Sequence, residues 1–270
     1  MQLDLLNIAA IPLDIAQADK QANLNAAEKA IGQLGREIDL VVLPELFSTG
    51  YINDHDALIE LSETNSGSTV ARMKEMAKQY GVAITGSFLA RIGGELRNRA
   101  FFIEPSGEEA FYDKAHLFGI SQESRDLHGG EQQSPIVRYR GWNIAMIVCY
   151  DLRFPVWCRN VGNSYDLMVV PANWPESRSY AWHQLLIARA IENQAYVVGA
   201  NRGGEDRFGV YPQSMTQIYD FAGKPIGAAS DDVVTATIDR AALSEARRKM
   251  PVSADADTFT IDPRYPKRTL

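Results

Sequence analysis

Two short apolar runs separated by a helical repeat open the chain, and this order restricts the fold more than any other feature. Leu3 to Ile11 and Asp39 to Leu43 lack a helical period, and a proline follows each, as is typical after buried strands. From Ala18 to Leu34, apolar residues recur at three- and four-residue steps, which indicates an amphipathic helix. A strand, a helix and a strand in this order predict two parallel neighbours in one sheet.

The remainder of the chain continues to mix strands with helices. Close turns separate several apolar runs and predict antiparallel hairpins, whereas longer segments carry helical patterns. We expect strands at 83–90, 100–103, 109–112, 135–139, 142–149, 167–170, 196–200, 214–220 and 233–238, and helices at 68–79, 153–160, 180–193 and 241–249. There is no internal repeat and no low-complexity linker, so the pattern predicts one α/β domain whose sheets are covered by helices.

Charge and cysteine content exclude several classes of function. The formal net charge is -7 and the isoelectric point is near 5.2, so neither nucleic acid nor an anionic membrane offers a favourable long-range field. The two cysteines do not make a disulfide framework, and no Cys/His set has zinc-finger spacing. The start lacks a basic segment, and no apolar run is long enough to cross a membrane. We therefore expect a cytoplasmic protein without a membrane span.

Cys149 is the first candidate for chemistry. It ends a strand-like run and precedes an expected helix, so its thiol is aimed out of the sheet edge, and a helix N-terminus would favour the thiolate. The alternative is an inert buried thiol, because free cysteine is among the most buried residue types. A nucleophilic cysteine needs a base or a cation beside it. A Cys-His dyad stays open, but no spacing selects one of His55, His116, His128 and His183.

Two charged residues stand where apolar strands stop, and each is a candidate partner for the thiol. Glu45 follows the second predicted strand, and Lys114 follows the run that ends at Tyr112. Charges flanked by apolar residues are costly unless they are paired. Each residue taken alone is more easily explained as a surface charge or a structural ion pair. Three chemically useful groups at three strand ends favour a catalytic set.

These segments resemble, in order and at similar spacing, the three motifs of the nitrilase superfamily of carbon-nitrogen hydrolases. The matching segments are Leu43-Pro44-Glu45, Tyr112-Asp113-Lys114-Ala115-His116-Leu117 and Cys149-Tyr150-Asp151-Leu152-Arg153-Phe154-Pro155. The resemblance extends from Leu3 to about Lys249. It implies a four-layer α-β-β-α sandwich, a single domain over residues 1–250, that pairs through its helical face into a homodimer or larger homo-oligomer. Residues 251–270 would form a tail that contacts a partner subunit or hangs free.

The resemblance also assigns roles to residues. It makes Cys149 the nucleophile, Glu45 the general base and Lys114 the cation that stabilises the oxyanion, with the backbone N–H of Tyr150 as a second donor. Glu123 stands where the family often carries a second glutamate that positions the lysine and the substrate, and its alternative is a solvated acid in a polar run. The resemblance implies a thioester on Cys149, and no metal or organic cofactor.

The segment Asn173-Trp174-Pro175 and the run 187–196 look closest to the bacterial omega-amidase branch. That branch takes omega-monoamides of short dicarboxylic acids, such as 2-oxoglutaramate, so a cation must hold the distal carboxylate. The candidates, which the sequence does not rank, are Arg153, Arg178 and Arg202. The alternative role of Arg153 is to hold its own turn by pairing with Asp151 or a neighbouring acid. The side chains expected to contact the substrate, although large aromatics are more often core, are Tyr51, Phe118, Tyr150, Asn173 and Trp174.

Other functions stay open at this point. The chain has Tyr211-Pro212-Gln213-Ser214 where related enzymes usually carry a Tyr-x-Gly-x-Ser run, and this segment is expected to shape the pocket and so the substrate. The same triad serves nitriles, carbamoyl compounds and deaminated glutathione in relatives. A non-catalytic binding module of the same fold is the remaining alternative, although such a module usually lacks a triad residue.

Overall fold

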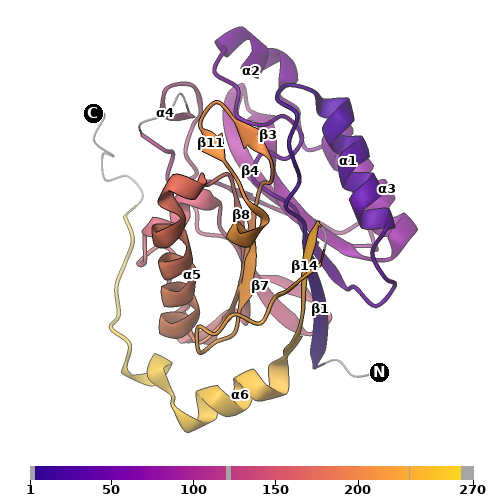
Figure 1. The fold of residues 1–270 in the computed structure, drawn as a ribbon. Coiled ribbons are helices and arrows are strands. Elements are labelled where there is room, and N and C mark those ends of the chain that lie inside the picture. The colour runs from indigo at the N-terminus through magenta and orange to yellow at the C-terminus, as the bar shows by residue number, and fades with distance from the viewer. Residues whose placement is uncertain (1–3, 120–122, 231, 263–270) are drawn as a thin grey trace.

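Alternation of side chains along the central strands explains why the chain forms stacked sheets. In β2 (Leu40–Val42), Leu40 and Val42 belong to the core that two sheets share, whereas Val41 packs with helices on the opposite face. A strand that is apolar on both faces needs cover on both. The computed structural model describes residues 4–119, 123–230 and 232–262, and these residues form four layers (Figure 1).

Within the described residues, the first sheet has seven strands in the order β13-β14-β1-β2-β3-β4-β5. β1 pairs in parallel with β2, and β2 with β3, while the other neighbours are antiparallel. The parallel pair predicted at the start of the chain is therefore confirmed. The remaining strands of this sheet are β1 (Leu5–Ala10), β3 (Ala83–Ile92), β4 (Glu95–Ile103), β5 (Glu109–Asp113), β13 (Ala228–Ser230) and β14 (Val233–Asp239).

The second sheet, in the same described part of the chain, has five strands in the order β12-β9-β8-β7-β6. β7, β8 and β9 are parallel, and an antiparallel strand stands at each edge. The strands are β6 (Val137–Tyr139), β7 (Trp142–Met146), β8 (Leu167–Ala172), β9 (Tyr196–Asn201) and β12 (Gln217–Tyr219). The carboxyl ends of β7 and β8 meet the loop after β2, where the backbone N–H of Glu45 faces the carbonyl of Ala172 at 3.5 Å.

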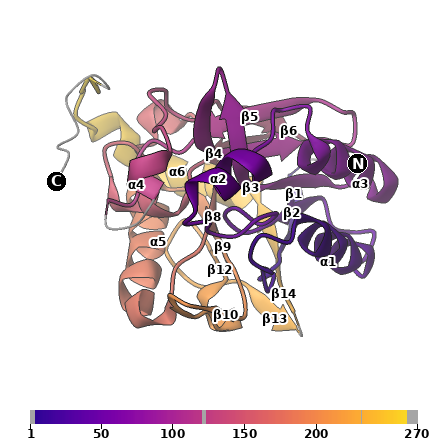
Figure 2. The same ribbon diagram turned by 90° about the horizontal axis from the view of Figure 1, so that it is seen from above.

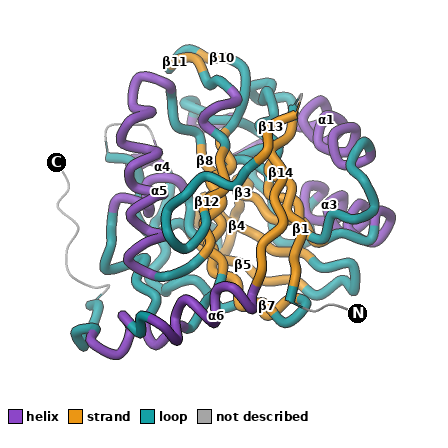
Figure 3. The backbone as a smooth tube through the Cα atoms, turned by 60° about the horizontal axis from the view of Figure 1, so that its bottom comes forward, coloured by secondary structure: helices purple, strands orange, loops and turns teal. Residues whose placement is uncertain are grey.

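Helices cover the outer face of each sheet. α1 (Lys20–Gly32) and α3 (Ser68–Tyr80) lie side by side on the seven-stranded sheet, and α5 (Ser179–Asn193) lies on the five-stranded sheet (Figures 1 and 2). α6 (Arg240–Lys249) follows β14 and runs across one end of the sandwich (Figure 3). The order helix, sheet, sheet, helix confirms the single-domain α-β-β-α sandwich. Within the described residues, no helix has the length and apolar character needed to cross a membrane.

Several local predictions are wrong. The helix expected at 153–160 is instead a 3₁₀ helix at Cys149–Arg153 followed by turns, because Pro155 has no N–H with which to continue a helix. The strand expected at 214–220 shortens to β12, after a 3₁₀ turn at Gln213–Met215. Three features were not predicted: α2 (His55–Leu61), α4 (Glu123–Asp126) and the hairpin of β10 (Glu205–Asp206) and β11 (Gly209–Val210).

The expected tail is described only in part. A 3₁₀ helix at Val252–Asp255 follows α6, and the hydroxyl of Ser253 accepts a hydrogen bond from Asn163 at 2.8 Å. Residues 263–270, the end of that tail, lie outside the described residues.

Candidate active site

Loops that leave the carboxyl ends of strands in both sheets bring the predicted residues together. Glu45 follows β2 and Lys114 follows β5 in the seven-stranded sheet, while Cys149 follows β7 and Asn173 follows β8 in the other. The site therefore lies where the two sheets meet. Open α/β structures place their sites at such strand ends.

Three charged side chains form a buried cluster. The ammonium Nζ of Lys114 donates to Glu45 Oε1 at 2.8 Å and to both carboxylate oxygens of Glu123 at 2.8 Å. The side chains of all three are fully buried. Glu123 is thus no solvated acid, and it also accepts a hydrogen bond from the backbone N–H of Phe118 at 2.9 Å. Its predicted contact with Lys114 is present.

Asn98 completes this cluster and was missed in the sequence. Its Nδ2 donates to Glu45 Oε1 at 2.8 Å and to Glu123 Oε1 at 3.0 Å, and its Oδ1 accepts from Ser87 at 2.9 Å. Asn98 is buried in β4, where a polar residue at an inward position of a strand was the available signal. It holds the two carboxylates in fixed positions beside the lysine.

Burial and charge set the protonation of the cluster. Burial by itself would lower the pKa of Lys114, but the adjacent carboxylates of Glu123 and Glu45 outweigh it and raise that pKa, so the lysine stays charged. Burial raises the pKa of Glu45, and Lys114 opposes the rise. Glu45 Oε1 also accepts from the Tyr51 hydroxyl at 3.1 Å, whereas Oε2 accepts no hydrogen bond of normal geometry from the described residues. Glu45 therefore keeps one oxygen available to take a proton.

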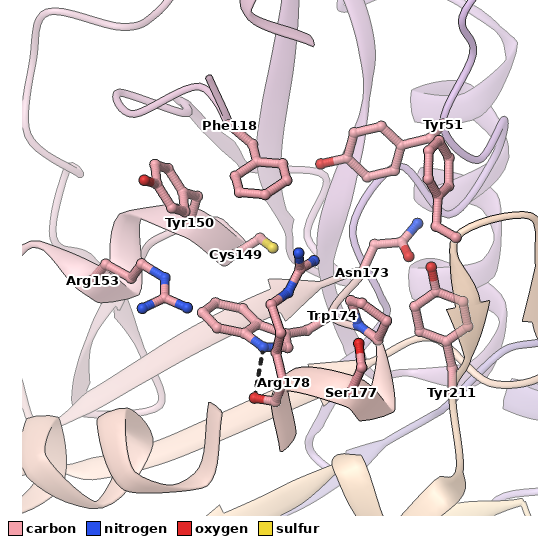
Figure 4. A pocket seen from close by; sticks show the side chains of 12 residues that line it. Tyr51, Phe118, Cys149, Tyr150, Arg153, Asn173, Trp174, Ser177, Arg178 and Tyr211 are labelled. Atoms are coloured by element: carbon pink, nitrogen blue, oxygen red, sulfur yellow. Dashed lines mark hydrogen bonds between the residues drawn. The ribbon is translucent and has the colours of Figure 1, made fainter. Parts of the chain in front are cut away.

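Cys149 occupies a sharp turn. Its φ of +43° lies in the left-handed region, which is unusual for a residue other than glycine. In this conformation the sulfur points into the pocket (Figure 4). Burial raises the pKa of the Cys149 thiol well above its usual value, and the Glu45 carboxylate raises it further. Lys114 and a hydrogen bond from the Asn173 backbone oppose this rise. The expected helix that would favour the thiolate is absent, so the resting sulfur is a thiol that needs a base.

A single carboxylate connects the turn of Cys149 to the segment of Lys114. Asp151 Oδ2 accepts from the backbone N–H of Val148 at 3.2 Å and from the Tyr112 hydroxyl at 2.7 Å. Its Oδ1 lies 2.9 Å from the backbone N and 2.8 Å from the Nδ1 of His116. His116 is engaged with Asp151 and stacks on Phe154, and no histidine lines the pocket among the described residues. This arrangement rules against a Cys-His dyad.

The pocket in front of Cys149 has a volume of about 290 Å³. Its described lining residues are Tyr51, Phe118, Cys149, Tyr150, Arg153, Asn173, Trp174, Pro175, Ser177, Arg178, Phe208 and Tyr211. Every predicted substrate contact except Arg202 is in this set, and the segment that departs from the family contributes Tyr211. Pro175, Ser177 and Phe208 were not predicted, and only the folded chain brings them to the wall.

Two of the three candidate arginines face this pocket. The Arg153 guanidinium lies over the Trp174 ring at 4.8 Å from its centroid, and that of Arg178 lies over the Phe118 ring at 5.0 Å. Neither forms an ion pair with a carboxylate of the described residues. Arg153 therefore does not tie its turn to Asp151. Figure 4 shows both guanidinium groups near Cys149.

The prediction that Arg202 binds substrate is wrong. Its Nη1 donates to Asp206 at 2.8 Å, its Nη2 donates to the carbonyl of Ile15 at 3.1 Å, and its guanidinium lies over the Tyr211 ring. Arg202 is only 2% exposed and does not line the pocket. A guanidinium whose donors are already occupied by buried acceptors cannot bind a ligand without breaking them.

The arrangement can therefore perform acyl transfer. It combines a thiol, an adjacent carboxylate with one unoccupied oxygen, and a charged lysine, in a pocket with two arginines on its walls. Within the described residues, no group of three or more His, Cys, Asp or Glu side chains is placed to hold a metal ion.

Comparisons with known proteins agree with this geometry. The family model for carbon-nitrogen hydrolases matches residues 7–248. Omega-amidase YafV of Escherichia coli is 39% identical, over 95% of this chain and 98% of its own length. The 2-oxoglutaramate amidase of Bacillus subtilis is 32% identical, over 92% of this chain and 96% of its own.

Solved structures give the same result. A carbon-nitrogen hydrolase superfamily protein from Xanthomonas campestris, with an arsenic adduct in its active site, is 36% identical and has a TM-score of 0.89, over 96% of this chain and 99% of its own. A mutant amidase from Nesterenkonia, with acrylamide added to its active-site cysteine, is 25% identical with a TM-score of 0.78, over 91% and 98% of the two chains. The chain therefore belongs to the carbon-nitrogen hydrolase family and is an amide-hydrolysing enzyme.

Proposed function

We propose that this enzyme hydrolyses omega-monoamides of short dicarboxylic acids, with Cys149 as nucleophile. The observation that carries this proposal is the pair of arginines, Arg153 and Arg178, that have no ion-pair partner among the described carboxylates and face the pocket of the buried thiol. Cations stacked on aromatic rings and left without a carboxylate partner are suited to bind the carboxylate of a ligand.

The first chemical step forms a thioester. Glu45 takes the proton of the Cys149 thiol while the sulfur attacks the amide carbon, and negative charge develops on the carbonyl oxygen. Lys114 lies 2.8 Å from Glu45 and supplies positive charge beside that oxygen, with the backbone N–H of Tyr150 as the second donor. The carbon-nitrogen bond then breaks, the proton passes from Glu45 to the nitrogen, and ammonia leaves.

The second step restores the enzyme. Water gives a proton to Glu45 and its oxygen attacks the thioester carbon, after which the carbon-sulfur bond breaks and the thiol of Cys149 regains the proton. Glu123 acts through Lys114 and Asn98 acts through Glu45, because each contacts that side chain and does not line the pocket. This chemistry requires no metal ion or organic cofactor.

Pocket size and charge support a small acidic amide. A volume of about 290 Å³ is at the lower end of ligand sites and suits a molecule of a few carbons. The arginines add positive charge to a chain whose formal net charge is -7, so an anionic substrate meets local cations. The printed names of the similar proteins, omega-amidase and 2-oxoglutaramate amidase, support the same class.

Ammonia release from 2-oxoglutaramate and succinamate tests this proposal, with butyramide as the amide that lacks a carboxylate. Wild type is expected to prefer the two acidic amides. Cys149→Ala is expected to lose about a thousandfold or more in turnover, because the nucleophile is gone. Cys158→Ala is the matched control, since Cys158 is equally a buried cysteine but lies outside the pocket. Equal turnover by wild type and Cys149→Ala would overturn the proposed nucleophile.

We also propose that the enzyme is a cytoplasmic homodimer that associates through its helical face. Large apolar side chains are exposed on and near α5, with Tyr180 79% and Ile191 50% exposed. Exposed apolar side chains on one face are suited to contact a second copy of the chain. Light scattering that gives only a 30.0 kDa species would contradict the homodimer.

A further inference from the structure

The β10–β11 hairpin forms a wall of the pocket on the side of the general acid. Phe208, in its turn, lines the pocket and packs edge-on against Tyr51, with ring centroids 6.5 Å apart. The hydroxyl of Tyr51 donates to Glu45 at 3.1 Å. Phe208 is therefore separated by one aromatic ring from the carboxyl group that returns a proton to the leaving nitrogen.

Three hydrogen bonds to Asp206, two of them partly buried, hold this hairpin in place. Asp206 accepts from the Arg202 guanidinium at 2.8 Å, from the backbone N–H of Phe208 at 2.8 Å and from the hydroxyl of Tyr211 at 2.9 Å. Arg202 is anchored in turn on the carbonyl of Ile15 at 3.1 Å. Displacing the hairpin would take the Asp206 carboxylate away from Arg202 and from the Tyr211 hydroxyl, which belong to buried residues, so the hairpin resists displacement.

The two sides of the pocket differ in charge. Figure 4 shows Arg153 and Tyr150 on one side of Cys149, and Tyr51, Tyr211 and Asn173 on the other. An amide carbon bonded to the sulfur carries an acyl chain and a nitrogen, which must point in different directions. A chain that ends in a carboxylate extends toward Arg153, and this leaves the nitrogen on the side of Tyr51 and Glu45.

We infer that Phe208 and Tyr211 close the pocket around the leaving nitrogen, so that the enzyme accepts primary amides and rejects amides that carry an alkyl group on nitrogen. This inference rests on the proposed role of Glu45. With a primary amide, the carbon-nitrogen bond breaks, Glu45 supplies the proton, and ammonia needs little room. With an N-ethyl amide, the leaving group is ethylamine, and its two carbons extend toward the wall that Phe208 and Tyr211 form.

The test measures kcat/KM for succinamate and for N-ethylsuccinamate with wild type, Phe208→Ala and Phe208→Leu. Wild type is expected to favour the primary amide strongly. Phe208→Ala is expected to raise the ratio of N-ethylsuccinamate to succinamate by roughly tenfold or more, since a pocket discriminates by about that factor for each carbon it excludes. Phe208→Leu, which retains a branched apolar side chain, is expected to raise the ratio less, and it replaces Phe208→Ala if that variant does not fold.

Val210→Ala is the matched control, because Val210 lies on the same hairpin, is 50% exposed and does not line the pocket. Its ratio is expected to equal that of wild type. Equal use of both amides by wild type, or a ratio that no Phe208 variant changes while succinamate is still hydrolysed, would overturn the inference alone. If wild type releases ammonia from no short primary amide, the proposed function fails and the inference falls with it.

Discussion

Two sets of charged side chains meet at Cys149, and their surroundings are opposite. Lys114 is fully buried and lies between two carboxylates, Glu45 and Glu123, at 2.8 Å from each. Arg153 and Arg178 lie on the pocket wall, stacked on aromatic rings and without an ion-pair partner among the described carboxylates. Carboxylates of the protein neutralise Lys114, whereas Arg153 and Arg178 remain available to a ligand.

This difference separates chemistry from recognition. A buried charge must be paired before substrate arrives, because an unpaired ion in the interior costs several kcal/mol (about 3–5 when one partner is removed). The cluster therefore positions the reacting groups at the same time as it stabilises the fold. An arginine on a pocket wall stays partly hydrated and needs no protein carboxylate, so it can exchange water for the carboxylate of a substrate.

Lys114→Met should have the largest effect on both stability and turnover. It leaves Glu45 and Glu123 buried without a cation, so we expect a loss of about 3–5 kcal/mol in the free energy of unfolding at pH 8. We also expect turnover to fall by roughly a thousandfold, because the charge beside the oxyanion is lost. Urea unfolding and ammonia release measure the two effects.

The stability deficit of Lys114→Met should shrink as the pH falls. The pKa of Glu45 is already raised by burial, and removal of Lys114 raises it further. A carboxyl whose pKa is higher in the folded state than in the unfolded state binds protons more readily in the folded state. It therefore destabilises the folded protein less as the pH falls. A deficit that stays constant between pH 8 and pH 5 would contradict the burial of an uncompensated carboxylate.

Arg178→Met should have a smaller effect, and it should alter substrate binding rather than stability. The loss of a charged hydrogen-bonding group should raise KM for succinamate by roughly 10- to 100-fold, while KM for butyramide and the free energy of unfolding change little. Arg153→Met, measured in parallel, identifies which arginine contributes more. Arg248→Met, on the exposed side of α6, is the control. If neither pocket variant alters KM for succinamate, recognition of the carboxylate by these arginines is excluded.

Glu63→Gln should have the smallest effect, because Glu63 is a paired charge nearer the surface. It accepts from the backbone N–H groups of Ser68 and Thr69 at the start of α3, and it lies 2.9 Å from Lys20. Burial alone would raise the pKa of Glu63, but these hydrogen bonds and Lys20 outweigh it and lower that pKa. We expect a loss of about 0.5–1 kcal/mol at pH 7, after allowance for solvent screening.

The stability deficit of Glu63→Gln should also shrink as the pH falls, but at a lower pH than that of Lys114→Met, because the pKa of Glu63 is lowered in the folded state and that of Glu45 is raised. A carboxyl with a lowered folded pKa contributes stability above its unfolded pKa, and this contribution is lost as the pH falls through the folded pKa. The difference in the free energy of unfolding between wild type and Glu63→Gln should therefore begin to narrow only below about pH 4.3. Equal free energies of unfolding of wild type and Glu63→Gln at pH 7 would contradict the stabilisation of the start of α3 by Glu63.

The sequence predicted the ends of strands better than the contacts between them. Glu45, Lys114 and Cys149 were recognisable because each follows an apolar strand within a motif. Asn98 was not, because its two partners lie 53 and 25 residues away along the chain. Arg202 was misassigned because no local pattern indicates that the carbonyl of Ile15, 187 residues away, accepts its hydrogen bond.

By itself, the sequence determined the alternation of strands and helices and the three motif segments, since hydrophobic period and turn residues act over a few positions. Only the tertiary structure decided which charges are neutralised inside the protein and which face the pocket. It also decided that Phe208 packs against Tyr51, whose hydroxyl donates to Glu45. The physical reason is that ion pairing, desolvation and steric exclusion depend on distance through space, and in this fold the groups that meet at Cys149 come from both sheets.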